Sequence, residues 1–393
     1  MTTHQLEDRE STWGIHALLS TSMTVETILG GCVVNKKLCV AKFLSEKLCV
    51  AKFLSDMSGC GHLRTIWPAQ ALNENGSHVH FETMTQFLNP QMLNSEIDAF
   101  CFHRAATEPQ LDRWKQYRKY MPNAKLVYEI DDSIFDINEH DNRRAYEFYQ
   151  PLLDNVWYMM QDADALIVNS TYMRYKLIKR GIPAKKIHII LNNFPENWRI
   201  KKKMPPKLNK NEKPKILFIG SASYSAELEW MQPLIERTTD KYTWVLTGFM
   251  RNLNHSFLSP IKGAFYPEFM EPNVMMHQLA DRVDPYIGVC PKLDTTFNRC
   301  RGTTKMLECG ILKIPAIGSK HRRWEEINGV IKLKNDHDLW EKTIDELVTN
   351  RTYYRNVVSA QNKQINGRWL KTAYKEWEQV FTEICCESSH RSK

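Results

Sequence analysis

The chain has 393 residues, of which 42% are apolar and 25% charged, so it is long enough for two globular domains and unlike a disordered or fibrous protein. No apolar run approaches the roughly 18–20 residues of a membrane span, and the acidic N-terminus lacks the basic and apolar segments of a secretory signal. The net charge of +8 suits a polyanionic partner such as nucleic acid, and equally a basic surface with a clamp for a diphosphate.

A tandem duplication precedes the first sheet. Residues 37–46 (KLCVAKFLSE) recur as residues 47–56 (KLCVAKFLSD), with a change only at the final acidic position. A shift of ten residues preserves strand parity, so both copies offer the same apolar face. Only the second copy runs directly into a glycine turn. We therefore expect 47–54 to be the central first strand, 37–44 to lie outside that position, and 1–36 to form an N-terminal extension.

Short apolar runs rich in β-branched residues alternate with amphipathic segments from residue 37 to residue 196. This alternation predicts parallel strands connected by helices, and therefore one doubly wound domain. Helices are expected at 109–120 and 142–161. The expected strands are 47–54, 78–82, 98–103, 125–130, 165–169 and 187–191.

A polar, basic segment with three prolines, residues 197–214, follows this first domain and is predicted to be a linker. A second alternating series then predicts another doubly wound domain over 215–366. The remainder, 367–393, contains a helix whose apolar residues recur at spacings of three and four. The expected fold is α/β, with two Rossmann-like domains facing across a cleft. Expected strands of the second domain are 215–220, 242–247, 285–290, 314–319 and 330–333.

The cysteines contain no C-x-x-C pair and no partnered histidine spacing, so the sequence does not predict a zinc site. Several of them lie inside apolar runs, where cysteine behaves as a small buried hydrophobe. We expect reduced thiols in a cytoplasmic protein.

The first candidate site is the turn after the first strand, where Gly59 and Gly61 let the backbone approach a ligand at a helix start. Arg64 is expected to face a phosphate or an acceptor from there. The alternative is that a turn between strand and helix needs glycine for its geometry alone.

A second candidate is the sequence YEIDD at the end of the fourth strand. Asp131 and Asp132 are placed to bind sugar hydroxyls, to orient an acceptor or to take a proton. They resemble a D-x-D metal motif, although we expect no metal, and the alternative is an acidic helix cap. The pair His103–Arg104, at the end of the third strand, is a weaker candidate.

The third candidate is the first turn of the second domain, IGSASY. Its small residues, including Gly220 and Ser221, free backbone N–H groups to face a diphosphate. An ordinary capped helix is the alternative interpretation.

The most specific candidate is the block FNRCRGTTKMLECGILKIPAIGS at residues 297–319. Gly302 and Thr303 open a helix. Arg301 and Lys305 supply cations for a diphosphate, and Glu308, one turn on, supplies a carboxylate for ribose hydroxyls. An ordinary Lys/Glu surface pair is the alternative if the block stands alone.

Together these segments resemble type-B (GT-B) glycosyltransferases of the large retaining family that includes sucrose and glycogen synthases, especially its phage-encoded members. The resemblance covers roughly residues 45–384. It implies a glycosyltransferase that uses a nucleotide-sugar donor, most plausibly a UDP-sugar, without a metal. By resemblance Arg301 and Lys305 bind the diphosphate and Glu308 binds the ribose. The chain departs from the family at Cys300, where a glutamate is common, and this leaves the stereochemical outcome open.

The basic stretch RWKQYRKY and the resemblance to phage enzymes favour hydroxymethylated cytosine in phage DNA as acceptor, in the host cytoplasm. An amphipathic helix with Trp114 and Tyr117 packed inward explains the same stretch. A surface polysaccharide or lipid-linked glycan is the alternative acceptor. A nucleotide-sugar epimerase and a non-catalytic nucleic-acid-binding protein of the same fold are the alternative functions. The transferred sugar and the oligomeric state stay open.

Overall fold

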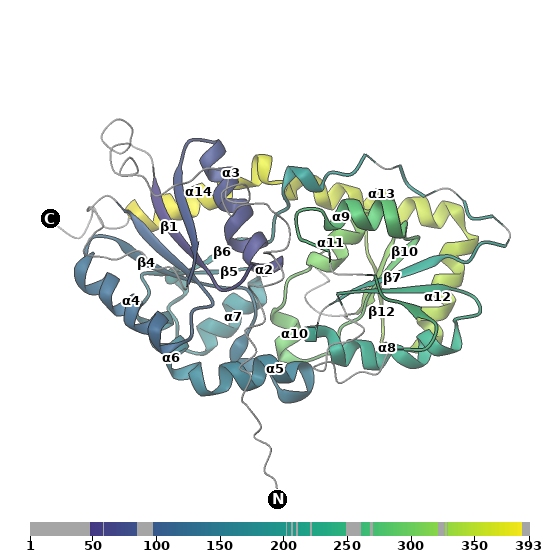
Figure 1. Cartoon of the computed structure of the whole chain (residues 1–393), viewed down its shortest axis with the longest axis horizontal. Coiled ribbons are helices and arrows are strands. Elements are labelled where there is room, and N and C mark those ends of the chain that lie inside the picture. The colour runs from purple at the N-terminus through teal and green to yellow at the C-terminus, as the bar shows by residue number, and fades with distance from the viewer. Residues whose placement is uncertain are drawn as a thin grey trace, which may run out of the picture. The chain divides into compact units, whose positions relative to one another are not determined.

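The computed structural model describes residues 48–386, except for 58, 85–96, 202, 206, 210, 221, 249–260, 268–269, 321–326 and 328. Within these residues the apolar runs form two six-stranded parallel sheets, which confirms the α/β fold class (Figure 1). Because all strands of one sheet run the same way, their carboxyl ends lie at one edge, where ligands bind in folds of this type.

The first sheet has the strand order β2-β1-β3-β4-β5-β6. The strand expected from the second copy of the duplication lies inside this sheet, with β2 on one side and β3 on the other. The first copy, 37–46, is outside the described residues. The strands are β1 (Cys49–Leu54), β2 (His78–Thr83), β3 (Ala99–His103), β4 (Lys125–Ile130), β5 (Ala165–Val168) and β6 (Ile187–Ile189).

The second sheet has the order β12-β11-β10-β7-β8-β9. Sequence analysis missed β9, whose two residues carry too little pattern to be recognised. The domain limits, including the linker at 197–214, stay a prediction; these residues lie between β6 and β7. The strands are β7 (Lys215–Ile219), β8 (Thr243–Thr247), β9 (Ala264–Phe265), β10 (Ile287–Cys290), β11 (Ala316–Ser319) and β12 (Ile331–Leu333).

Helices connect the strands and bury their apolar faces against the sheets, as the amphipathic pattern predicts. The expected helix at 142–161 is divided in two, α5 and α6, by a short 3-10 turn that contains Pro151. The main helices are α3 (Trp67–Glu74), α4 (Glu108–Tyr120), α5 (Glu139–Tyr149), α6 (Leu153–Asp162), α7 (Thr171–Lys179), α8 (Ser225–Arg237), α10 (Thr296–Cys300), α11 (Thr304–Ile311), α12 (His337–Thr349), α13 (Arg351–Ile365) and α14 (Leu370–Cys386).

The last helix, α14, packs on the first sheet although it follows the second in sequence. Figure 1 shows it, in yellow, beside α3. Trp377, Phe381 and Ile384 lie at the apolar spacing seen in the sequence and are buried together with Val50 of β1 and Leu72 of α3. The C-terminal helix therefore completes the core of the N-terminal sheet.

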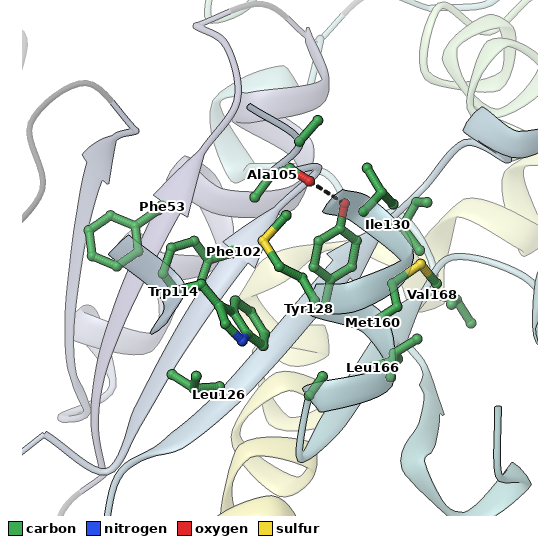
Figure 2. Packing of buried hydrophobic residues seen from close by; sticks show 14 of the residues in the cluster. Phe53, Phe102, Ala105, Trp114, Leu126, Tyr128, Ile130, Met160, Leu166 and Val168 are labelled. Carbon is green, nitrogen blue, oxygen red and sulfur yellow. Dashed lines mark hydrogen bonds between the residues drawn. The ribbon is translucent and has the colours of Figure 1, made fainter. Parts of the chain in front are cut away.

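The opposite face of the first sheet is an aromatic and aliphatic cluster (Figure 2). Tyr128 is fully buried there and donates a hydrogen bond to Ala105 O at 2.6 Å, which satisfies its hydroxyl. Trp114 and Tyr117 of α4 belong to the same cluster. Trp114 and Tyr117 are thus core residues and are not available to stack on a base, whereas Tyr120, the last aromatic of RWKQYRKY, is 43% exposed.

The basic end of α4 also lies away from the carboxyl edge. Arg118 binds Asp164 at 2.8 Å, and Asp164 directly precedes β5, at the amino edge of the sheet. Arg118 therefore lies on the side of the sheet opposite to the candidate site.

Candidate active site

Side chains from the carboxyl edges of both sheets are in contact. Asn192, after β6, donates to Thr304 Oγ1 of α11 at 2.7 Å, and Ser170, after β5, donates to Cys300 O at 3.1 Å. Arg301 Nε lies 3.7 Å from Asp132 Oδ1. The sequence-predicted residues around Asp132 and around Arg301 are therefore brought together, as expected for a site built from both sheets.

Asp131 and Asp132 are held by one arginine. Arg104 binds Asp131 through Nε and Asp132 through Nη2, the latter at 2.9 Å, and it adopts a left-handed backbone with φ of 54° to do so. Neither carboxylate residue occupies the N-cap position of the short helix that follows, Ile134–Asp136; that position is Ser133. The weaker candidate pair His103–Arg104 thus supports the YEIDD carboxylates.

Asp131 is the more enclosed of the two carboxylates, and His103 Nε2 lies 3.1 Å from its Oδ1. Burial alone would raise the pKa of Asp131, but Arg104 and His103 outweigh burial and hold this pKa well below the usual value. Asp131 is therefore a permanent anion at neutral pH. Asp132, whose side chain is 20% exposed, is the carboxylate that a ligand can reach.

Arg64 is not presented to a ligand, contrary to the sequence expectation. Its guanidinium is fully buried, donates to Glu129 Oε1 at 2.7 Å and to Ile190 O at 2.8 Å, and lies against the ring of Trp377. The reason is that Glu129, on β4, needs a cation once it is buried. Lys52 Nζ, 3.2 Å from Glu129 Oε2, completes this buried group.

Arg64 still connects to the site through one neighbour. Its Nη1 donates to Asn192 Oδ1 at 3.0 Å, and Asn192 in turn binds Thr304 at the start of α11. Arg64 can therefore help to hold α11 in place through Asn192, without contacting a ligand itself.

The two glycines of the first turn differ in what they require. A Cβ atom on Gly61 would lie 1.8 Å from Asp56 O, whereas one on Gly59 would meet nothing within 4 Å. Close backbone packing therefore explains Gly61, and no steric requirement explains Gly59.

We expect Gly61→Ala to lower the free energy of unfolding by about 1–3 kcal/mol, because the backbone at Asp56 has to move. Gly59→Ala, the matched control, should leave stability unchanged or raise it by up to about 1 kcal/mol, because alanine loses less entropy on folding. Urea unfolding followed by circular dichroism measures both. Equal stability of the two variants would contradict the packing argument.

Of the third candidate turn, Gly220 donates its N–H to Thr247 O at 3.0 Å, so that group is used within the second sheet. Ser221 lies outside the described residues. Ser223 and Tyr224 of the same turn bind Arg301: Arg301 Nη2 donates to Ser223 Oγ at 2.9 Å, and Arg301 Cζ lies 4.1 Å from the centre of the Tyr224 ring. The turn therefore positions a cation in this structure.

The helix predicted to open after Gly302 is α11, and Thr303 is its N-cap residue. A Cβ on Gly302 would lie 3.2 Å from Asn169 Nδ2 and 3.3 Å from Asn192 Nδ2, so the glycine permits close approach of the first sheet's loops. Helix α11 itself approaches β10 even more closely, since a Cβ on Gly288 would lie 2.2 Å from Cys309 Sγ. Two glycines thus fix the position of α11.

Lys305 and Glu308 form the i,i+3 pair that the sequence allowed. Lys305 Nζ lies 3.1 and 3.0 Å from the two oxygens of Glu308, whose side chain is only 2% exposed. Burial alone would lower the pKa of Lys305, but Glu308 outweighs it and the pKa is raised. The ammonium is therefore charged, and with a side chain 24% exposed it is within reach of a ligand.

Sequence reasoning missed Lys292, which follows β10 at the same edge. It is buried, its Nζ lies 4.0 Å from the centre of the Tyr224 ring, and it donates to Asn298 Oδ1 at 3.3 Å. Asn298 also donates to the buried Glu227 at 2.7 Å. A single lysine in a loop gives no sequence signal, so only the fold could reveal this group.

Three other sequence expectations concern metals, thiols and membranes. Among the described residues, no three His, Cys, Asp or Glu side chains are grouped so as to hold a metal ion. The cysteines in the described ranges are free thiols. No helix in the part of the chain that the structure describes is long and apolar enough to cross a membrane.

No protein-family model matches the chain, and no curated protein matches it. Solved structures do match. Anabaena HepE in complex with UDP and glucose is 13% identical with a TM-score of 0.59, over 86% of this chain and 100% of that one. Sucrose-phosphate synthase from Thermosynechococcus elongatus is 12% identical with a TM-score of 0.61, over 86% and 99%.

A third match is an alpha-glucosyltransferase in complex with UDP and a 13-mer DNA containing a central A:G mismatch. It is 13% identical with a TM-score of 0.59, over 86% of this chain and 100% of that one. At such identities the likeness is one of fold. The chain has the two-sheet α/β fold of the type-B glycosyltransferases.

Proposed function

We propose that the chain is a glycosyltransferase that moves a sugar from a nucleotide-sugar donor, a UDP-sugar, to a hydroxyl acceptor. The observation that carries the proposal is the contact of Asp132 with Arg301 at the carboxyl edges of two Rossmann-like sheets. The pair Lys305 and Glu308 follows Arg301 on the next helix. Transfer from a nucleoside diphosphate needs cations for the leaving group and polar groups for the sugar. The complexes of UDP with HepE and with the alpha-glucosyltransferase support a donor of this class.

The cations in this proposal are assigned to the diphosphate. Arg301 offers a planar guanidinium and Lys305 a partly exposed ammonium, and both stabilise the negative charge that develops as the sugar leaves. Gly302 and Thr303 bring the start of α11 close to that charge, where a helix N-terminus favours an anion. Glu308 is assigned to the ribose hydroxyls.

The carboxylates are assigned to the sugar or acceptor side. Asp132 contacts a hydroxyl of the sugar or of the acceptor, and Asp131 holds Arg104 and so fixes Asp132. Gly59 and Gly61 place the first helix turn next to this pair. Arg64 acts through Asn192 and α11, and makes no direct contact with the donor.

For the acceptor, we propose hydroxymethylated cytosine in DNA as the first to test. The net charge of +8 and the DNA complex of one structure of the same fold support this choice. The position of α4 does not, because its Trp114 and Tyr117 are buried and Arg118, near its C-terminal end, binds Asp164 at the amino edge. A surface polysaccharide or lipid-linked glycan is the alternative acceptor.

The test is incubation with a panel of UDP- and GDP-sugars and hydroxymethylated DNA, followed by mass spectrometry of the nucleosides. We expect a glycosylated nucleoside and release of UDP. Arg301→Ala should lower the rate at least about tenfold, because it removes a charge-assisted contact worth about 1.5–3 kcal/mol. Lys342→Ala, at an exposed site on α12, is the matched control and should leave the rate unchanged.

The alternative functions give different results in the same assay. An epimerase converts a nucleotide sugar without any acceptor, and a binding protein consumes none. Consumption of a UDP-sugar only when a glycan replaces DNA would overturn the DNA acceptor and leave the transferase standing.

A further inference from the structure

Lys292 carries a buried amino group that the roles assigned above do not use. Only 2% of the surface of Lys292 is exposed. Its backbone N–H donates to Ser319 Oγ at 2.7 Å, and its carbonyl accepts from Asn335 Nδ2 at 2.9 Å. Two strand ends thus fix the main chain of Lys292, and its side chain has to extend into the interior beside Tyr224.

One aromatic ring contacts two cations. The Tyr224 ring centre lies 4.0 Å from Lys292 Nζ and 4.1 Å from Arg301 Cζ. The face of an aromatic ring attracts a cation, so a charged Lys292 orders the ring and the guanidinium together. A neutral amine would contribute much less to this arrangement.

Charged groups of both signs surround Lys292. Arg301 repels its ammonium, and Glu227 and Asp132 attract it, with the thiol of Cys290 also facing it. Asn298 bridges Lys292 to Glu227, since it accepts from one and donates to the other. Within the described residues, Asn298 is the only hydrogen-bond partner of the ammonium.

Burial is the largest effect on Lys292 and lowers its pKa, Arg301 lowers it further, and the acidic groups only partly compensate, so the pKa is about 7. Because this pKa lies near neutrality, an added charge changes how much of the amine is protonated. An anion next to Arg301 favours the protonated form of Lys292.

We propose that Lys292 is a positioning residue of the diphosphate site, which holds Tyr224 and Arg301 in place and takes up a proton when the diphosphate binds beside Arg301. The proposal rests on the proposed function, because the donor supplies the anion. The proton passes from a buffer acid or hydronium ion in solvent, whose bond to the proton breaks, to the lone pair of Nζ, where an N–H bond forms. Donor binding and proton uptake are thus linked.

Calorimetric titration with UDP, in buffers of different ionisation enthalpy from about pH 7 to about pH 8.5, tests this linkage. We expect the wild-type protein to take up close to one proton per UDP at the higher pH. The affinity of the wild type for UDP should fall as the pH rises over this range, with a slope that approaches about tenfold per pH unit. Lys292→Met, which keeps the volume and removes the charge, should show neither effect, and Lys342→Ala should behave like wild type.

The wild-type measurement is decisive even if the variant fails to fold. Binding of UDP without proton uptake and with constant affinity overturns the role of Lys292 and leaves the proposed function standing. If the wild type binds neither UDP nor another nucleoside diphosphate, the proposed function fails, and sulfate, which does not titrate in this range, becomes the probe. Proton-linked sulfate binding then supports the role of Lys292, and unlinked or absent binding overturns it.

Discussion

Glu129→Gln should lower the free energy of unfolding by about 3–5 kcal/mol, the largest stability effect that we expect from one substitution. Glu129 is fully buried between Arg64 and Lys52, which are themselves 0% exposed. Glutamine keeps the shape of the side chain but leaves two buried cations without their counter-charge. Urea unfolding followed by tryptophan fluorescence measures the loss.

The matched control is Glu147→Gln. Glu147 also pairs with an arginine, Arg143, at 2.8 Å, but its side chain is 60% exposed. Solvent screens such a pair, so its loss should change stability by less than about 1 kcal/mol. Similar losses in the two variants would show that the buried group does not stabilise the fold as we infer.

The effect of Glu129 should also depend on pH. Burial alone raises its pKa, but Lys52 and Arg64 outweigh burial and the pKa in the folded protein lies below the ordinary value of 4.5. Its contribution is therefore complete above that value and is lost as the pH falls through the folded pKa. The stability difference between wild type and Glu129→Gln should shrink accordingly in acid.

Lys305→Ala should weaken UDP binding by roughly 10- to 150-fold, because a charge-assisted bond to the diphosphate is worth about 1.5–3 kcal/mol. Glu308→Gln should weaken binding of the ribose hydroxyls, because the substitution replaces one of two hydrogen-bond-accepting oxygens by an NH2 group that can only donate. Titration with uridine separates these roles: Glu308→Gln should weaken uridine and UDP alike, and Lys305→Ala only UDP.

Because Lys305 and Glu308 bind each other, each change also alters the partner that stays behind. Lys342→Ala removes a lysine from an exposed position of the same half of the chain and controls for the overall charge. UDP binding as tight as wild type in both Lys305→Ala and Glu308→Gln would show that the donor site is assigned wrongly.

The strands could be predicted because buried parallel strands are continuous apolar runs, and the two-sheet fold followed from their alternation with helices. The sequence also placed Asp131 and Asp132 at a strand end, where parallel topology gathers ligand-binding groups, and Arg301 directly before a helix. It could not show that Arg64 is enclosed, since its partners Glu129 and Trp377 are far away along the chain. Lys292 was missed for the same reason: its environment is made by Tyr224, Asn298 and Arg301, which only folding assembles.

The position of α14 has a consequence for the order of events during synthesis. Its Trp377 lies against Lys52 and Arg64, and its Phe381 and Ile384 close the core around β1. Domains usually fold as they emerge from the ribosome, N-terminal part first. Here the first sheet to be synthesised lacks one wall until the final helix is released. The N-terminal half therefore stays incompletely folded until the C-terminal half has been synthesised. We expect the N-terminal half to be the part of the chain that a chaperone would bind.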